Sequence, residues 1–139
     1  MNLLKIFIVV FITTVTISAQ QQKMPVFINY SGEDLVGEKL FYVIKEEIRK
    51  SSSMELSYNI ENSFVLNIVS ADYDANGPGN ACVYSIAWCV QFSLSLPQYY
   101  YTSSVGSCGL DRVEDVAGRL VALTDDKIAQ LKLHEVIKK

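Results

Sequence analysis

The sequence has only one histidine, His134, close to its C-terminal end. A Ser-His-Asp triad needs a histidine held beside its nucleophile by a third group, so the pattern gives this type of catalysis little support. Cys89 is a candidate thiol nucleophile, but no basic residue lies near it in the sequence. Asp72 and Asp74 are candidate acid and base groups, although their alternating positions fit a turn better. The composition therefore favours a protein that is not an enzyme.

Positive charge is also scarce, with 12 Lys and Arg against 15 Asp and Glu and a net charge of -3. Nucleic acids are bound largely through Lys and Arg that neutralise phosphates, and the sequence has no basic stripe, so we expect no nucleic-acid partner.

Charge of either sign is missing between Asp74 and Asp111, an interval that contains Trp88, Tyr99 and Tyr101. Aromatic rings with polar tips are enriched in recognition surfaces, because they give contact area at low entropic cost. An uncharged interval is equally typical of a buried sheet, and burial is the commoner fate of a tryptophan. The candidate binding residues are Tyr99, Tyr101 and Trp88.

Long hydrophobic runs are absent except at the N-terminus, where Ile6–Ile12 is fully apolar and follows Lys5. A membrane-spanning helix needs about 20 apolar residues, so this shorter run predicts a cleaved signal peptide over 1–19 rather than a retained anchor. No cysteine precedes Cys82, which leaves no acceptor for a lipid anchor. The mature protein, residues 20–139, is expected to be one domain exported to the periplasm or secreted.

Alternating and three-to-four-residue apolar spacings predict two helices and about five strands. The expected helices cover 33–50, capped by Ser31, and a segment that begins at Asp111. The expected strands cover 25–30, 56–60, 64–69, 81–94 and 98–107, of which the second and third form a hairpin. This content predicts an α+β fold, a two-layer sandwich with both helices on one face of a mostly antiparallel sheet. The opposite sheet face is then left open.

Three cysteines, Cys82, Cys89 and Cys108, lack the close pairs of a structural zinc site. If the chain turns near Ser95, Cys82 lies directly across from Cys108 on one face of two antiparallel strands. Opposed positions are close enough for a disulfide, so we expect a Cys82–Cys108 bond and a free thiol at Cys89. Pairing of Cys89 with Cys108 is the alternative, which requires a bulge or a displaced turn.

Residues 72–77 match the first half of a calcium-binding loop, with Asp72, Asp74 and Asn76 as candidate ligands. The twelfth position of such a loop carries a bidentate glutamate, and here it is Val83. Asp, Asn and Gly also favour tight turns. The segment is therefore interpreted as a turn, with calcium as the alternative and no other cofactor expected.

The order of these elements resembles that of small exported domains of the bacterial cell envelope, namely the N-terminal domain of the TolB type and the curli-secretion and penicillin-binding-protein activator lipoproteins. The resemblance lies in the strand ending at 28–30, the helix opening at 32–34 and the closing helix from Asp111. The signal end at 18–20 resembles those of the Bacteroidetes group. The resemblance implies an envelope protein and supplies no functional residue.

The leading hypothesis is an exported, non-enzymatic domain that binds a protein or a cell-wall component through the open sheet face or the 72–80 loop. A metal-assisted or thiol-dependent enzyme that uses Asp72, Asp74 or Cys89 is one alternative. A self-assembling structural protein is another, because uncharged strands that are left uncovered can pair edge to edge.

Overall fold

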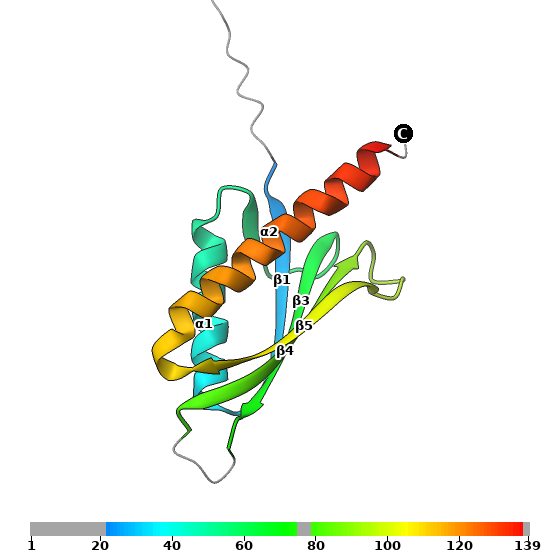
Figure 1. Ribbon diagram of the computed structural model, residues 1–139. Helices are drawn as coiled ribbons and strands as arrows, with labels where there is room; N and C mark the ends of the chain where they lie inside the picture. The colour runs from blue at the N-terminus through cyan, green and yellow to red at the C-terminus, as the bar shows by residue number, and fades with distance from the viewer. Residues whose placement is uncertain (1–21, 75–78, 138–139) are drawn as a thin grey trace, which may run out of the picture.

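Two helices pack on one face of a five-stranded sheet in the computed structural model, which describes residues 22–74 and 79–137 (Figure 1). The predicted signal peptide lies outside these residues. The elements are β1 (Met24–Ser31), α1 (Leu35–Lys50), β2 (Met54–Ser57), β3 (Ser63–Asp72), β4 (Ala81–Gln91), β5 (Tyr99–Gly109), a 3-10 turn η1 (Leu110–Arg112) and α2 (Val113–Ile137). The predicted α+β fold class is confirmed.

The strand order in the sheet is β2-β1-β3-β4-β5. β1 lies parallel to both of its neighbours, whereas β3, β4 and β5 pair antiparallel over longer stretches. The predicted hairpin between the second and third strands is therefore wrong, because β1 is inserted between β2 and β3. A β-α-β crossover through α1 places β2 on one side of β1 and leaves the other side for β3.

β4 and β5 pair in the predicted register from Ala81 to Trp88. Cys82 lies opposite Cys108, and the shift in register comes only between Trp88 and Cys89, where a bulge interrupts the pairing. Because neighbouring residues of a strand point to opposite faces, the even-numbered side chains of β4 face the helices and the odd-numbered ones face away. This alternation separates the core of the protein from its open surface.

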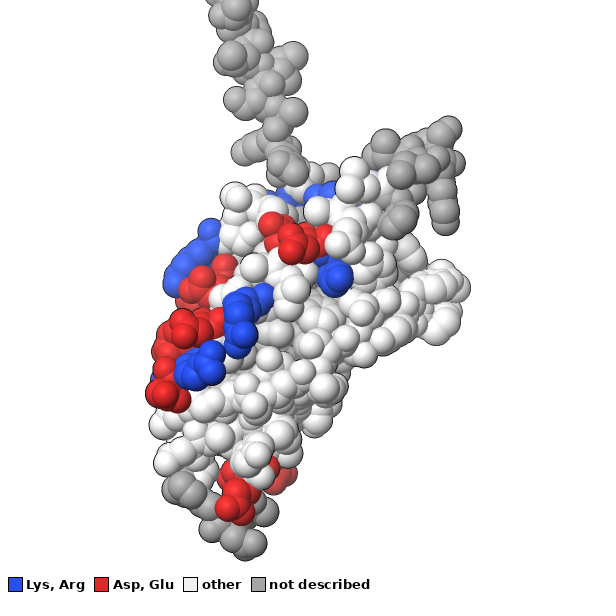
Figure 2. Space-filling model, viewed as in Figure 1, with Lys and Arg blue, Asp and Glu red and all other residues white. Residues whose placement is uncertain are grey.

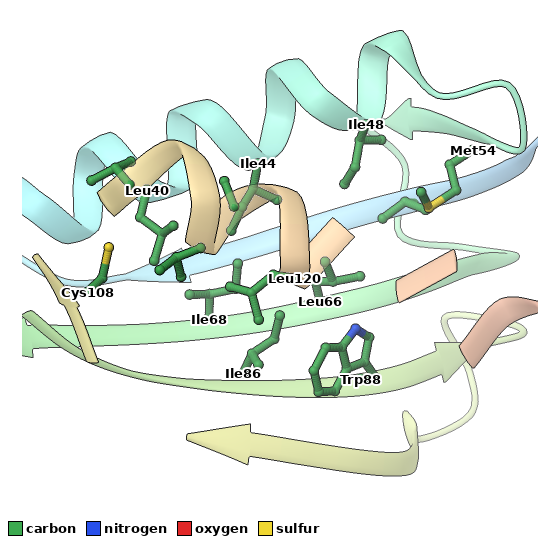
Figure 3. Close-up of a cluster of buried hydrophobic side chains, with 14 of the residues drawn as sticks. Leu40, Ile44, Ile48, Met54, Leu66, Ile68, Ile86, Trp88, Cys108 and Leu120 are labelled. Atoms are coloured by element: carbon green, nitrogen blue, oxygen red, sulfur yellow. The ribbon is translucent and has the colours of Figure 1, made fainter. Parts of the chain in front are cut away.

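The core fills the space between the sheet and the helices (Figure 3). Burial of each large aliphatic side chain contributes about 1.5–3 kcal/mol, which makes this layer the main source of stability. Its buried residues include Leu40, Ile44, Ile48, Met54, Leu66, Ile68, Ile86, Trp88, Cys108 and Leu120.

A buried hydrogen bond joins the sheet to α2. The indole Nε1 of Trp88 donates to Oγ1 of Thr124 at 2.9 Å, and that hydroxyl donates in turn to the carbonyl of Leu120 at 2.8 Å. An unpaired buried indole N–H is costly, so the bond fixes where α2 crosses β4.

The N-terminus of α1 is capped by Asp34, and the predicted cap at Ser31 is wrong. The Asp34 carboxylate accepts a hydrogen bond from the Gly37 amide at 2.5 Å and a second bond from the Ser70 hydroxyl on β3. Gly37 packs so closely that an added Cβ would lie 1.9 Å from the Ser70 hydroxyl oxygen. Aspartate is as suitable an N-cap residue as serine, and the contact with Ser70 holds the Asp34 carboxylate at the start of α1.

Helix α2 runs without interruption for 25 residues. Asp111, where the sequence predicts this helix to begin, lies in η1 instead. Gly118 lies on the exposed surface of α2, where no atom lies within 4 Å of an added Cβ. Close glycine contacts are instead made elsewhere, for example at Gly106, where an added Cβ would lie 2.6 Å from the Tyr84 hydroxyl.

Candidate functional site

The sheet face opposite the helices is hollowed across β3, β4 and β5. Three valines project from it, with exposed fractions of 55% for Val69, 41% for Val83 and 78% for Val105. They line a shallow, largely open hollow of about 530 Å³ that has few polar walls. Its outward-facing side chains are Val69, Ala71, Val83, Ser85, Val105 and Ser107. No charged residue contributes to this lining.

A row of amide side chains crosses the same face farther along the strands. Nδ2 of Asn29 donates to Oδ1 of Asn67 at 3.2 Å, and Nδ2 of Asn67 donates to Oε1 of Gln98 at 3.0 Å. The same amide nitrogen lies 3.6 Å from the sulfur of Cys89. Sequence reasoning missed this row, because it depends on the parallel pairing of Asn29 with Asn67. Their outward positions in two predicted strands were the available signal.

The tip of the β4–β5 hairpin carries exposed aromatic rings. Phe92 and Tyr99 are 48% and 51% exposed and pack edge to face, with ring centroids 5.6 Å apart. The buried Gln91 side chain donates to the carbonyls of Ser93 and Leu96 and so holds the loop between the rings. In the view of Figure 2, charged side chains gather over the helices and the hairpin surface is uncharged.

The three predicted binding residues have different environments. Tyr99 is exposed, whereas Tyr101 is partly buried and donates to Oε1 of Gln130 on α2 at 3.2 Å. Trp88 is 2% exposed and belongs to the core, so its side chain offers no surface to a partner and that prediction is corrected. Tyr100, which was not singled out, is 66% exposed and lies opposite Cys89 on the open face.

The cysteines are free thiols, and the predicted Cys82–Cys108 disulfide is not formed. The two residues are opposite each other as expected, but their sulfurs are not bonded, and the Cys108 thiol donates to the Gly109 carbonyl at 3.4 Å. Burial, reinforced by the charge of Asp34, raises the pKa of Cys82 to about 12. Burial also raises the pKa of Cys108. Both sulfurs are therefore held in the unreactive protonated form. Cys89 is free, as predicted.

The candidate calcium ligands begin a turn at the end of β3. The Asp74 amide donates to the Asp72 carboxylate at 3.2 Å, and the Tyr73 amide donates to the Ala81 carbonyl at 3.0 Å. The first bond is that of an Asx turn. Asn76 lies outside the described residues. Within 22–74 and 79–137 no group of three or more His, Cys, Asp or Glu side chains is placed to hold a metal ion. Calcium binding stays a prediction.

The candidate catalytic residues do not form one site. Asp72 pairs with Cys82 at one end of β4, and Cys89 lies near the other end. At about 3.3 Å per residue along a strand, the two positions are roughly 23 Å apart. A reaction that uses a carboxylate of the 72–74 segment together with the Cys89 thiol is incompatible with this separation.

Comparison with known proteins found no family model that matches this chain and no curated protein with significant similarity to it. The resemblance to TolB-type and lipoprotein domains therefore stays a prediction. For the part of the chain that is described, neither helix combines the length and the apolar character required to cross a membrane.

Proposed function

We propose that the protein is an exported, non-enzymatic domain of the cell envelope or the secreted fraction, which binds a protein partner through the open face of its sheet. Export rests on the signal peptide predicted over 1–19. Binding rests on one observation, the shallow, uncharged hollow of about 530 Å³ on the open face of β3, β4 and β5. Apolar hollows with few polar groups are the usual form of a binding site.

The chemistry of the lining favours a protein over a glycan. Val69, Val83 and Val105 offer methyl groups, and the Ser85 and Ser107 hydroxyls are the polar side chains among the outward-facing residues. A glycan requires many hydrogen-bonding partners for its hydroxyls, whereas an aliphatic or aromatic side chain fits a methyl-lined hollow. Each exposed valine that a partner covers contributes up to about 1.5 kcal/mol.

The second predicted surface, the 72–80 loop, adjoins this cavity. Ala71 and Val83 line the hollow and stand next to the two ends of that segment. The binding surface that we propose therefore includes the open face and the described residues at the two ends of this segment, 72–74 and 79–80. Tyr100 extends it beyond the amide row with an exposed ring on the same face.

The test compares two variants with the same starting exposure on opposite sides of the molecule. Val83 on the open face and Leu123 on α2 are both 41% exposed. Capture from a cell-envelope extract identifies a partner, whose affinity for V83K and L123K is then measured by calorimetry. We expect V83K to weaken binding at least tenfold, because the partner would bury the ammonium group unpaired, and L123K to bind normally. Equal affinities, in variants with unchanged circular dichroism, would rule out the open face.

A further inference from the structure

Strand β5 forms a long edge of the sheet. The strand order leaves β2 and β5 at the two edges, and these strands have 4 and 11 residues. An edge strand presents unpaired main-chain N–H and C=O groups, which pair readily with a further strand. The length of β5 gives this edge most of the unpaired groups of the sheet.

The register identifies which groups point outward. The Leu110 amide donates to the Asn80 carbonyl at 2.8 Å, which continues the β4–β5 ladder past its end. Because hydrogen-bonding direction alternates along an antiparallel strand, the even-numbered residues nearby bond to β4, and Ser103, Val105 and Ser107 direct their backbone groups outward. Within 22–74 and 79–137, no backbone hydrogen bond from another element reaches these outward groups.

The usual protection of an edge is missing from most of β5. Natural edge strands are blocked by lysine, proline, inward-pointing charges or bulges. β5 has no charged residue and no proline, and its bulge lies at one end, beside Tyr101. Residues 102–109 therefore form a regular, uncharged pairing edge.

We infer that β5 pairs antiparallel with β5 of a second copy of this chain, around a two-fold axis beside Val105. This pairing places Val105 next to its counterpart and Ser103 next to Ser107, with about six main-chain hydrogen bonds between the copies. β-Branched and hydroxyl cross-strand pairs are favourable, and β5 brings no like charges into contact although the chain carries a net charge of -3. The inference does not rest on the proposed function.

The self-complementary edge is what favours a second copy over another partner. In an isologous dimer both copies use the same surface, so assembly stops at two copies. Addition of β5 to β2 of the next copy would continue without limit, but β2 has only 4 residues with which to pair. Pairing of β5 with β5 of the second copy would join the two five-stranded sheets into one sheet of ten strands.

The first test measures mass against concentration by sedimentation equilibrium of the mature protein, residues 20–139. We expect a plateau at twice the mass of one chain. V105P removes an N–H that points away from β4, so the variant should fold but lose two hydrogen bonds of the dimer. At about 1 kcal/mol for each bond, the dissociation constant rises about thirtyfold. V105T keeps the N–H and the branched shape, and its affinity should be unchanged.

A charge exchange distinguishes the loss of pairing from the loss of folding. V105K and V105E alone place like charges beside each other and should dimerise weakly, whereas an equimolar mixture should restore the dimer. The inference is overturned if the chain stays monomeric up to about 1 mM or if its mass rises beyond that of two copies. It is also overturned if V105P and V105T dimerise with equal affinity, or if the mixture of V105K and V105E does not form dimers. V83K should dimerise normally, so failure of the binding proposal remains distinguishable.

Discussion

Replacement of Asp34 by alanine tests the contact that decides where α1 begins. The carboxylate accepts hydrogen bonds from the Gly37 amide, which is the cap, and from the buried Ser70 hydroxyl. Loss of a helix cap costs about 1 kcal/mol, and loss of a hydrogen bond to a charged group costs about 1.5–3 kcal/mol. The Ser70 hydroxyl keeps its bond to Tyr30 at 2.9 Å, which moderates the second cost. We expect D34A to lower the free energy of unfolding by about 3 kcal/mol.

Two further variants separate the contributions. D34N keeps an oxygen for the Gly37 amide and presents its amide nitrogen to Ser70, whose hydroxyl accepts as well as donates, so its cost is about 1 kcal/mol. S31A removes the cap that the sequence motif predicts and should change stability by less than about 0.5 kcal/mol, because Ser31 is exposed.

Urea unfolding followed by circular dichroism measures all three variants against the parent. The expected order of destabilisation is D34A, then D34N, then S31A. If S31A cost as much as D34A, Ser31 would be the true cap and the described contact between Asp34 and Ser70 would be refuted.

Two other predictions concern packing and thiol chemistry. G37A should destabilise the protein by more than about 2 kcal/mol, because the new Cβ would lie 1.9 Å from the Ser70 hydroxyl oxygen. G118A, on the exposed side of α2, should stabilise the protein by about 0.5–1 kcal/mol. Thermal unfolding measures both variants, and similar shifts of the melting temperature would contradict the packing described. All three thiols are buried and should react slowly with a disulfide reagent in the folded protein at pH 8, Cys82 also because burial raises its pKa to about 12. All three should react after unfolding, and a single reactive thiol in the unfolded chain would instead show that two of the cysteines form a disulfide.

The antiparallel half of the fold was predictable because local patterns suffice there. Alternation along 81–94 assigned Val83 and Ser85 to the open face, and one turn near Ser95 fixed the partner of Cys82. A slip of one residue would turn all the apolar side chains of a strand away from the core, and the position of the turn selects among the registers that remain. The sequence therefore contained both the faces and the register of β4 and β5.

The parallel half was not predictable from the same patterns. Alternation shows that 56–60 and 64–69 favour strands, but it contains no information that β1 would lie between them. Insertion of β1 depends on α1 covering the sheet, a contact between residues far apart in the chain. The pairing of Asn29 with Asn67 and the contact of Asp34 with Ser70 follow from this insertion, which is why both escaped prediction.

The cavity was predictable in its composition and not in its shape. An open, uncharged sheet face follows from the alternation of β4 and from the missing charges between Asp74 and Asp111. The meeting of Val69, Val83 and Val105 around one hollow depends on the register and curvature of three strands together. Strand twist and coiling are collective properties of a sheet, to which no single residue pattern corresponds.

The single tryptophan is a built-in optical reporter of one interface. Because Trp88 lies beneath α2 and its indole bonds to Thr124, its emission wavelength responds when water enters between the helix and the sheet. A ligand on the open face contacts the opposite side of β4 and leaves the indole dry. Intrinsic fluorescence therefore reports the separation of α2 from the sheet without an added label, and it does not respond to a ligand in the hollow on the open face.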